Sequence, residues 1–425
     1  MHQERGQVTA PLEPPKLILD IFSELQCARP WPPDHERRLL AEGLEQARLA
    51  DRLGYGCWWT VEHHGATEFS HSSAPEMMLA AISQHTERIH LGHSGVLAPF
   101  HINHPVRVAE RGAWVDLLSD GRLEMGLARS GGAEWDTFAV EPESSRDQLR
   151  EALHMIPRMW TETDFEWHSD LIEIPQRDIV PKPLQDPHPP LWQTSTSPES
   201  FAMAGELGVG VLCTTLLTPL DSLRALLDHY DEGLSRCQPA GRFVNAQRSA
   251  FTFVHCAESR AAAIESGAGE AALWFVNAAP KVFQVPRSLW IDSIRGEFMS
   301  SVPESTRALS APEEHGDLDL DDPVPVIALL NRQMAGQPLD PEEVYEVLEP
   351  VESVVIGDEE LCRKKMQGFA DIGVDRLMCM MQIGALPHET VMQSIRRVGE
   401  ILLPEFAGRE RRSESTRPDT AVGSG

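Results

Sequence analysis

Short apolar segments alternate with longer amphipathic segments along most of this 425-residue chain. The short segments are rich in residues that favour strands. Each is followed by a stretch with apolar residues at every third or fourth position, which is the spacing of one helix face. Eight such units in one chain predict a (β/α)8 TIM barrel, an α/β fold with a closed parallel sheet. The expected strands are 16–22, 55–61, 89–97, 122–128, 189–195, 209–215, 249–256 and 376–384.

The helices are expected between these strands. In the first, Leu40, Leu44, Ala47, Ala50 and Leu53 form the inner stripe, and Gly54 ends it. The later helices are expected at 75–86, 106–117, 149–160, 198–207, 219–235, 259–277 and 388–402. The segment FEWHSDLIEIP, which follows the fourth helix, indicates an inserted hairpin.

Residues 278–350 interrupt the alternation. The segment PEEHGDLDLDDP (312–323) is too acidic to pack in a core. A long non-periodic stretch after the seventh strand predicts an excursion or a lid on the active-site side, or else a solvated linker. The ends, 1–15 and 406–425, are polar and lack apolar periodicity, so disordered tails are expected there, around a barrel that spans 16–405.

The charge and the composition of the chain exclude some classes of binding partner. The formal net charge of −28 argues against nucleic acid or anionic lipid as a partner, because both require clustered Lys and Arg. No apolar run is long enough to cross a bilayer, and the amino terminus lacks the layout of a secretory signal. The seven cysteines are scattered without paired spacing. We therefore expect a cytoplasmic protein with reduced cysteines, in which any anionic ligand binds at a local positive spot.

The segment WWTVEHHGATEFS (58–70) ends a strand with Glu62, His63 and His64. Neighbouring strand residues point to opposite faces, so both histidines cannot face one metal ion. The other nearby histidines match no common ligand spacing, and no metal site is expected. His63 stands at the carboxyl end of a strand, where barrel sites lie. An imidazole there is suited to moving protons near neutral pH.

A second group of residues predicts an anion site. In STSPES (195–200), Ser197 is the expected N-cap and Pro198 the first residue of a helix, whose free amides attract an anion. Thr196, Ser197 and Ser200 add hydroxyl groups. Arg129 ends the neighbouring strand in GLARSGG, where a guanidinium can pair with phosphate.

These segments resemble the bacterial luciferase-like family of flavin-dependent monooxygenases. The resemblance rests on segments in the family's order: WWTVEHHGATEFS, IHLGHSGVLAPFHINHPVRVAERGAWVDLLSDGRLEMGLARSGG, TSTSPESFAMAGELG and VVIGDEELCRKKMQGFADIGVDRLMCMM. It covers the chain from about 16 to 405, apart from 278–350. It implies a barrel that binds reduced FMN from a separate NAD(P)H:flavin reductase. O2 would add to the flavin as a C4a-(hydro)peroxyflavin and oxygenate a small substrate by hydroxylation, Baeyer-Villiger insertion or N-oxidation.

The resemblance also assigns residues. His63 is similar to the family's catalytic imidazole, and Glu62 to the carboxylate beside it, which either orients His63 or anchors the loop. Ser94 and Gly95 match a non-proline cis peptide under the flavin ring. The phosphate site corresponds to Arg129, Ser130, Thr196, Ser197 and Ser200. Family barrels often pair through their second and third helices, where Met77, Met78 and Trp114 lie, so a homodimer is expected.

Two departures from the family pattern limit what the resemblance implies. Ala128 replaces the reactive cysteine of luciferase, so light emission and long-chain aldehyde substrates are not implied. Ser130 replaces the glycine that usually follows the phosphate-binding arginine. Two alternatives stay open: an F420-dependent hydride-transfer enzyme of the same fold, and a non-catalytic flavin-binding subunit. The histidine at position 63 favours an enzyme over a non-catalytic subunit.

Overall fold

A computed structural model describes residues 17–284, 286–295 and 318–406. The expected tail at 1–15 and the first half of the acidic segment 312–323 lie outside these ranges. The expected carboxyl-terminal tail also lies outside them, except at its first residue. Phe406 ends helix α15 (Leu403–Phe406) and is buried, so the folded part of the chain extends one residue further than expected.

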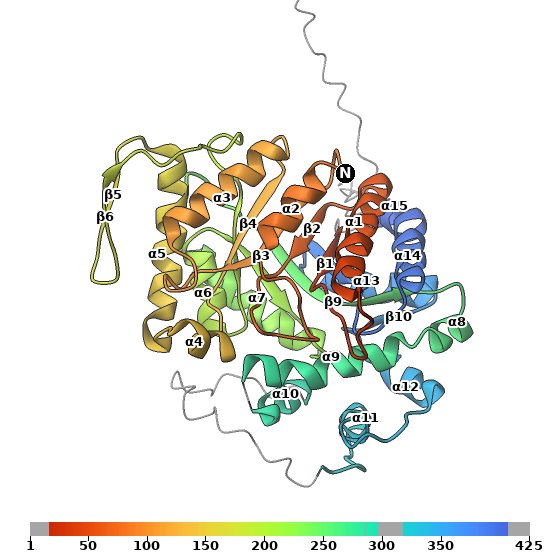
Figure 1. Ribbon diagram of the computed structural model, residues 1–425. Coiled ribbons are helices and arrows are strands. Elements are labelled where there is room, and N and C mark those ends of the chain that lie inside the picture. The colour runs from red at the N-terminus through yellow and green to blue at the C-terminus, as the bar shows by residue number, and fades with distance from the viewer. Residues whose placement is uncertain (1–16, 285, 296–317, 407–425) are drawn as a thin grey trace, which may run out of the picture.

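Eight parallel strands close into a barrel, which confirms the predicted fold (Figure 1). Neighbouring strands follow the chain order, and the last strand pairs with both its predecessor and the first, which closes the ring. The barrel strands are β1 (Ile18–Ser23), β2 (Cys57–Thr60), β3 (His90–Leu97), β4 (Leu123–Ala128), β7 (Leu191–Thr194), β8 (Gly210–Thr214), β9 (Arg248–Cys256) and β11 (Arg376–Met380). Each overlaps one of the eight predicted strands.

Helices surround the barrel and bury their apolar faces against it. In α1 the inward residues include Leu39, Ala47 and Ala50, whereas Leu40, expected in the inner stripe, is 46% exposed. The helices are α1 (His35–Leu53), α2 (Pro75–Ser83), α3 (Pro105–Leu118), α4 (Ala133–Phe138), α5 (Pro142–Thr161), α6 (Pro198–Glu206), α7 (Leu220–Leu234), α8 (Arg260–Glu265), α9 (Ala268–Phe283), α10 (Arg287–Ile294), α11 (Pro325–Met334), α12 (Pro341–Leu348), α13 (Glu359–Asp371), α14 (His388–Arg397) and α15.

Two small additions extend the barrel. The predicted hairpin is present as β5 (Phe165–His168) and β6 (Glu173–Arg177), which pair antiparallel and project from one side of the molecule (Figure 1). A further short strand, β10 (Val355–Gly357), pairs parallel with the end of β9 outside the ring. The sequence pattern did not predict β10.

The interpretation of 278–350 as non-periodic is wrong for the part that the structure describes. Helix α9 continues through Pro280 to Phe283, and α10, α11 and α12 follow. Helix α11 buries Ile327, Leu329 and Leu330, so it has an apolar face of its own. Helices α9 to α12 lie together along one side of the barrel (Figure 1). They bring new side chains to the site described below.

The interior of the barrel is filled with large and polar side chains. Trp59 and Trp192 meet edge to face with ring centroids 5.2 Å apart. Buried Asp20 accepts hydrogen bonds from the Trp59 indole at 2.9 Å and from the Arg376 guanidinium at 2.8 and 2.9 Å. Glu124 accepts one from the Trp192 indole at 2.7 Å. These side chains fill the interior of the barrel, and in barrels of this kind ligands bind at the carboxyl ends of the strands.

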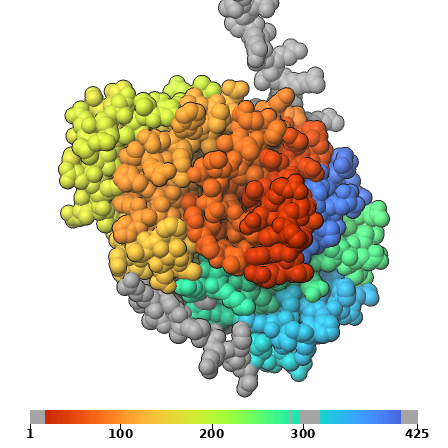
Figure 2. All heavy atoms as spheres, in the orientation of Figure 1, coloured from red at the N-terminus to blue at the C-terminus, as the bar shows by residue number. Residues whose placement is uncertain are grey.

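Helices α1 to α3 form a broad outer face. Figure 2 shows the red and orange segments, from β1 to α3, across the centre of the view. On these helices Met77 is 69% and Trp114 58% exposed, whereas Met78 is buried in the core and is unavailable to a second subunit. In the part of the chain that the structure describes, no helix has the length and apolar character needed to cross a membrane.

Candidate active site

A cavity of about 690 Å³ opens at the carboxyl ends of the barrel strands. Its wall includes every site residue predicted from the sequence except Ser200. The predicted residues on the wall are Glu62, His63, Ser94, Gly95, Arg129, Ser130, Thr196 and Ser197. The volume lies within the usual range for small-molecule and cofactor sites.

His63 lies between two buried carboxylates on this wall. Its Nδ1 is 3.1 Å from Oε1 of Glu134 in α4, and its Nε2 is 3.8 Å from Oε2 of Glu24, which directly follows β1. An ionised carboxylate only accepts hydrogen bonds, so Nδ1 carries a proton toward Glu134. Nε2 then faces Glu24, whose Oε2 has no hydrogen-bond partner among the described residues.

The surroundings shift the pKa of all three groups. Burial alone would lower the pKa of His63, but the hydrogen bond that it donates to Glu134 and the nearby charge of Glu24 raise its pKa above the usual value. Burial would raise the pKa of Glu134, but its contacts with His63 lower it. For Glu24, burial outweighs the nearby charge of His63 and raises its pKa to about 7. Near neutral pH, Glu24 therefore changes charge readily beside an imidazole that can share its proton.

Glu62 does not orient His63. Its carboxylate accepts hydrogen bonds from the Leu97 amide at 2.9 Å and from the Asn103 side chain at 2.9 and 3.1 Å, and it lies 3.2 Å from Nε2 of His64. The sequence left open whether Glu62 orients His63 or anchors a loop, and these contacts are those of a loop anchor. The carboxylate that contacts His63 is Glu134.

Ser130 takes part in this arrangement through both its backbone and its side chain. Its φ of +68° lies in the left-handed region that favours glycine, which explains the family's glycine at this position. Its hydroxyl donates a 2.7 Å hydrogen bond to Oε2 of Glu134. Serine at this position is thus strained in its backbone, but its hydroxyl holds Glu134, the partner of His63, in place.

The amino terminus of α6 has the cap that the sequence predicts. Ser197 is the N-cap and Pro198 the first helical residue. The Ser200 hydroxyl accepts from the amides of Thr196 and Ser197 at 3.1 and 3.0 Å, and it donates to the Ser197 carbonyl at 2.8 Å. The predicted role of Ser200 as a ligand hydroxyl does not agree with this geometry, since its hydroxyl builds the cap. Thr196 and Ser197 remain on the cavity wall.

Arg129 follows β4 and is held toward the same corner of the cavity. Its Nε donates to the Ser145 hydroxyl at 2.7 Å and its Nη2 to the Pro142 carbonyl at 3.0 Å. Its guanidinium carbon lies 5.2 Å from the centre of the Trp135 ring. Because β4 and β7 are paired, the guanidinium and the α6 terminus stand at adjacent strand ends. Together they form a positive corner on a strongly acidic protein.

The centre of the cavity has two features that fit a flat polar ligand. The Ser94–Gly95 peptide bond is cis, as the family resemblance implies. A Cβ at Gly95 would lie 2.8 Å from the backbone carbon of Leu127, so only glycine fits there. The buried hydroxyls of Thr194 and Thr214, also on the wall, have no hydrogen-bond partner among the described residues. Unpaired buried hydroxyls are costly, and a polar ligand would satisfy them.

The opposite side of the cavity is aromatic. Phe283 at the end of α9 lies with its ring centroid 5.5 Å from that of His63, and Trp290 of α10 packs on Phe283 at 6.3 Å. Phe69 and Phe275 extend the same wall. Phe283 and Trp290 fall within the stretch expected as an excursion or lid on the active-site side, and they form part of the site.

Sequence reasoning missed Glu24, Glu134 and these aromatic rings. Glu24 comes directly after the apolar run LILDIFS, and a carboxylate at a strand end is a usable signal of a barrel site. Glu134 sits in a six-residue helix after the RSGG turn, where no periodicity marks it. Its role appears only when α4 is placed beside His63.

The fold and the site together define a class: a (β/α)8 barrel whose strand ends bring a histidine between two carboxylates, and an arginine beside a helix amino terminus, to one cavity. The family model for luciferase-like monooxygenases matches residues 25–376, and the chain belongs to this family.

Individual relatives match shorter stretches. The oxygenase component of flavin-dependent trigonelline monooxygenase from Acinetobacter baylyi is 30% identical over 210 residues, which cover 49% of this chain and 57% of that protein. Limonene 1,2-monooxygenase from Rhodococcus erythropolis is 32% identical over 191 residues, or 44% and 48% of the two chains. The chain therefore spans about half the length of the curated relatives it matches.

Solved structures agree in fold. The monooxygenase RslO1 from Streptomyces bottropensis has a TM-score of 0.68 at 22% identity, and the match covers 92% of this chain and 100% of that one. The oxygenating constituent of 3,6-diketocamphane monooxygenase from Pseudomonas putida, in complex with FMN, scores 0.64 at 15% identity over 92% and 99%. An F420-dependent secondary alcohol dehydrogenase scores 0.62 at 14% identity over 90% and 98%. These likenesses establish the barrel.

Proposed function

We propose that this protein is the oxygenase of a flavin-dependent monooxygenase, which binds reduced FMN and uses O2 to oxygenate a small organic substrate. The single observation that carries the proposal is that His63, held between two carboxylates, and the positive corner of Arg129 and the α6 terminus line one cavity. The aromatic wall favours an apolar substrate. Hydroxylation, Baeyer-Villiger insertion and N-oxidation all suit such a site.

The phosphate of FMN is proposed to bind at the positive corner. Arg129 would pair with it, and Thr196 and Ser197 at the start of α6 would donate hydrogen bonds to it. Ser130 would support this corner through the backbone of its loop. The ring would lie toward Ser94 and Gly95, where the unpaired hydroxyls on the wall can satisfy its polar atoms. When bound, reduced FMN supplies the electrons and the oxygen-activating chemistry that no side chain here provides.

The chain's own contribution to the chemistry is to hold and move a proton. Glu134 fixes Nδ1 of His63 and keeps the imidazole basic, so Nε2 is the nitrogen that gives or takes the proton. Glu24, 3.8 Å from that nitrogen and with a pKa of about 7, is placed to exchange the proton with it. The aromatic wall would keep bulk water from the reacting centre.

Two partners belong to the proposal. The printed name of the Acinetobacter relative describes an oxygenase component, which supports a separate NAD(P)H:flavin reductase as the source of reduced FMN here. A homodimer is proposed through the face that exposes Met77 and Trp114, since large exposed apolar groups favour association. A cytoplasmic location remains a prediction from the sequence.

Cofactor titration is the direct test of this function. FMN, anaerobically reduced FMN and F420 are each titrated into the purified chain, and binding is followed by fluorescence. Reduced FMN is expected to bind. Uptake of isotopically labelled O2 into products of candidate substrates then reports oxygenation. Binding of F420 alone would support the hydride-transfer alternative, and binding of FMN without any oxygenation or oxygen consumption would support a non-catalytic subunit.

A matched pair of variants tests the histidine. His63→Asn is expected to abolish product formation while FMN still binds, because Arg129 and the α6 terminus, which would hold the FMN phosphate, are unchanged. His168→Asn is the control, since His168 on the β5–β6 hairpin is exposed and lies beside carboxylates of the same hairpin. Equal activity of His63→Asn and the parent chain would refute the proposed role.

A further inference from the structure

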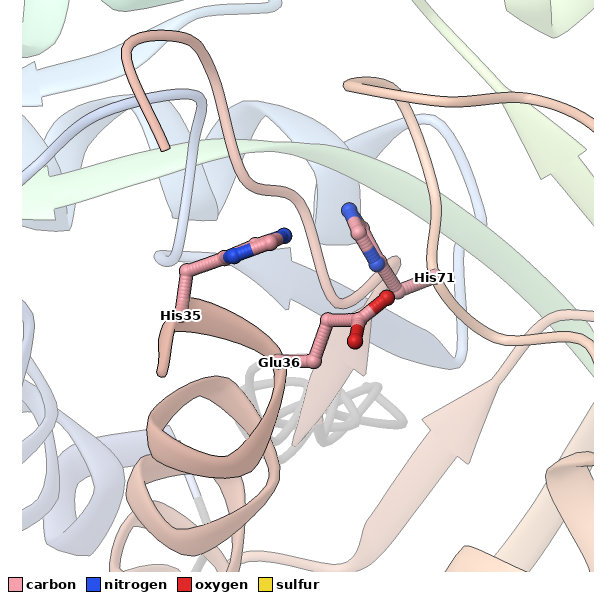
Figure 3. Close-up of side chains that lie close together, drawn as sticks. All are labelled: His35, Glu36 and His71. Atoms are coloured by element: carbon pink, nitrogen blue, oxygen red, sulfur yellow. The ribbon is translucent and has the colours of Figure 1, made fainter. Parts of the chain in front are cut away.

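Two histidines and a glutamate meet outside the cavity, on the loops that follow β1 and β2. His35 and Glu36 are the first two residues of α1, and His71 lies in the loop between β2 and α2. One ligand atom from each can be chosen so that all three lie within 4.8 Å of one another (Figure 3). None of the three lines the cavity described above. The group is therefore separate from the proposed oxygenation site.

The histidine rings are oriented as ligands are. Nδ1 of His35 lies 3.0 Å from the carbonyl oxygen of Pro32, which can only accept, so Nδ1 carries the proton and Nε2 keeps its lone pair. Metal-binding histidines commonly fix their tautomer in this way, through a carbonyl or carboxylate on the other nitrogen. Nε2 of His35 and Nε2 of His71 are both buried and have no hydrogen-bond partner among the described residues.

The surroundings hold both rings in place. The Trp31 ring stacks on His35 at 4.7 Å and meets His71 edge to face at 5.6 Å. The His71 amide donates to the Leu25 carbonyl at 3.1 Å, which ties the two loops together. Glu36 is exposed, so its side chain can change rotamer more freely than the two histidine rings.

From these observations we propose that His35, Glu36 and His71 bind one divalent transition-metal ion of the zinc class. Two histidines and a carboxylate with a water molecule in the fourth position are a known ligand set for zinc. Ligands about 2.0–2.2 Å from an ion lie no more than roughly 4 Å apart, so the three atoms, now within 4.8 Å of one another, need to close by less than about 1 Å. The ion would clamp the two loops that begin just beyond Glu24 and His63. Its role is structural, and it does not depend on the proposed oxygenation.

Spacing along the chain could not reveal this site. Sequence analysis included His71 among histidines that match no common ligand spacing and predicted no metal site. The ligands come from two loops 35 residues apart in the sequence, and only the pairing of β1 with β2 brings them together.

Metal titration of the full chain, stripped with a chelator, tests the proposal. Wild-type protein is expected to bind one Zn²⁺ per chain by calorimetry, to show the visible absorbance of His-ligated Co²⁺, and to melt at a higher temperature with Zn²⁺ than without. His35→Gln and His71→Gln should each lower Zn²⁺ affinity by at least about tenfold, since loss of even an outer partner has effects of that size. Glu36→Gln should also weaken binding.

His168→Gln serves as the control, because it removes an exposed, carboxylate-flanked histidine far along the chain; it should bind Zn²⁺ as the wild type does. Melting without metal checks that each variant folds. Failure of the folded wild type to bind Zn²⁺ or Co²⁺ would show that these side chains form only an aromatic cluster and would overturn the proposal. Equal affinity of folded His35→Gln, His71→Gln and wild type would overturn it as well.

Discussion

Replacing Glu134 by Gln should lower the pKa of His63, because it removes a charge from the nearest partner of the imidazole while keeping its shape. The two side chains are only 7% and 11% exposed, so water screens the contact little. A hydrogen bond to a charged group contributes about 1.5–3 kcal/mol. At about 1.4 kcal/mol per pKa unit, the expected fall is about one to two units.

The pKa of His63 should fall and not rise, because burial is the main effect left in the variant. Burial lowers the pKa of His63, and the contacts with Glu134 are the largest of the effects that oppose it. Without that charge, Glu24 at 3.8 Å is the remaining close carboxylate, and its own pKa of about 7 leaves it only partly ionised near neutral pH. The variant imidazole should therefore be less protonated at pH 7 than that of the parent chain, and any activity that needs the imidazolium should move to lower pH.

Ring resonances of isotope-labelled histidine, followed by NMR across pH, measure this pKa directly. Glu62→Gln is the matched control, since Glu62 contacts His64 and should lower mainly the pKa of His64, whereas its effect on the pKa of His63 is smaller than that of Glu134. An unchanged pKa of His63 in Glu134→Gln, or an equal fall in Glu62→Gln, would refute the reasoning.

Three further predictions concern binding and stability. Arg129→Ala should weaken FMN binding by about 10- to 100-fold, the loss of one charge-assisted contact, and leave riboflavin binding unchanged in parallel fluorescence titrations; equal losses for both ligands would argue against a phosphate site. Ser130→Ala should melt at a lower temperature than Ser130→Gly, because both lose the bond to Glu134 but only glycine relaxes the positive φ; the reverse order would contradict this explanation. Burial lowers the pKa of His255 to about 4. The pKa of His255 in the unfolded chain is about 6.5. Between about pH 6.5 and pH 4 the unfolded chain therefore binds a proton at His255 that the folded chain does not, and the free energy of unfolding falls as the pH falls. His255→Phe should reduce this fall in the free energy of unfolding by up to about 3 kcal/mol, as measured by chemical unfolding at a series of pH values. An unchanged dependence of the unfolding free energy on pH would disprove the explanation.

The barrel was predictable because its strands are buried on both faces and appear as apolar runs separated by helical periodicity. The helices after β9 were harder to predict than the barrel strands. Gly267, with a φ of +75°, divides one expected helix into α8 and α9, and Pro280 marks an apparent end that the helix passes through. The acidic residues of 312–323 made the whole stretch look unable to pack, so the apolar face of α11, which follows it, was not predicted.

The site was predictable where chemistry lies at strand ends and unpredictable where it depends on packing. His63, Arg129 and the α6 cap were found from position alone. Glu134 acts only because α4 returns to the mouth of the barrel beside β2. His35 and His71 approach each other only because two loops pack together. Contacts between segments far apart in the sequence leave no periodic signal in a single sequence.

The position of the cofactor tests the central claim most directly. A crystal structure of the protein soaked with FMN is expected to show the phosphate at Arg129 and the first turn of α6, with the ring beside Ser94, Gly95 and His63. Density for FMN at another place, or an empty cavity in crystals that bind FMN elsewhere, would contradict the account.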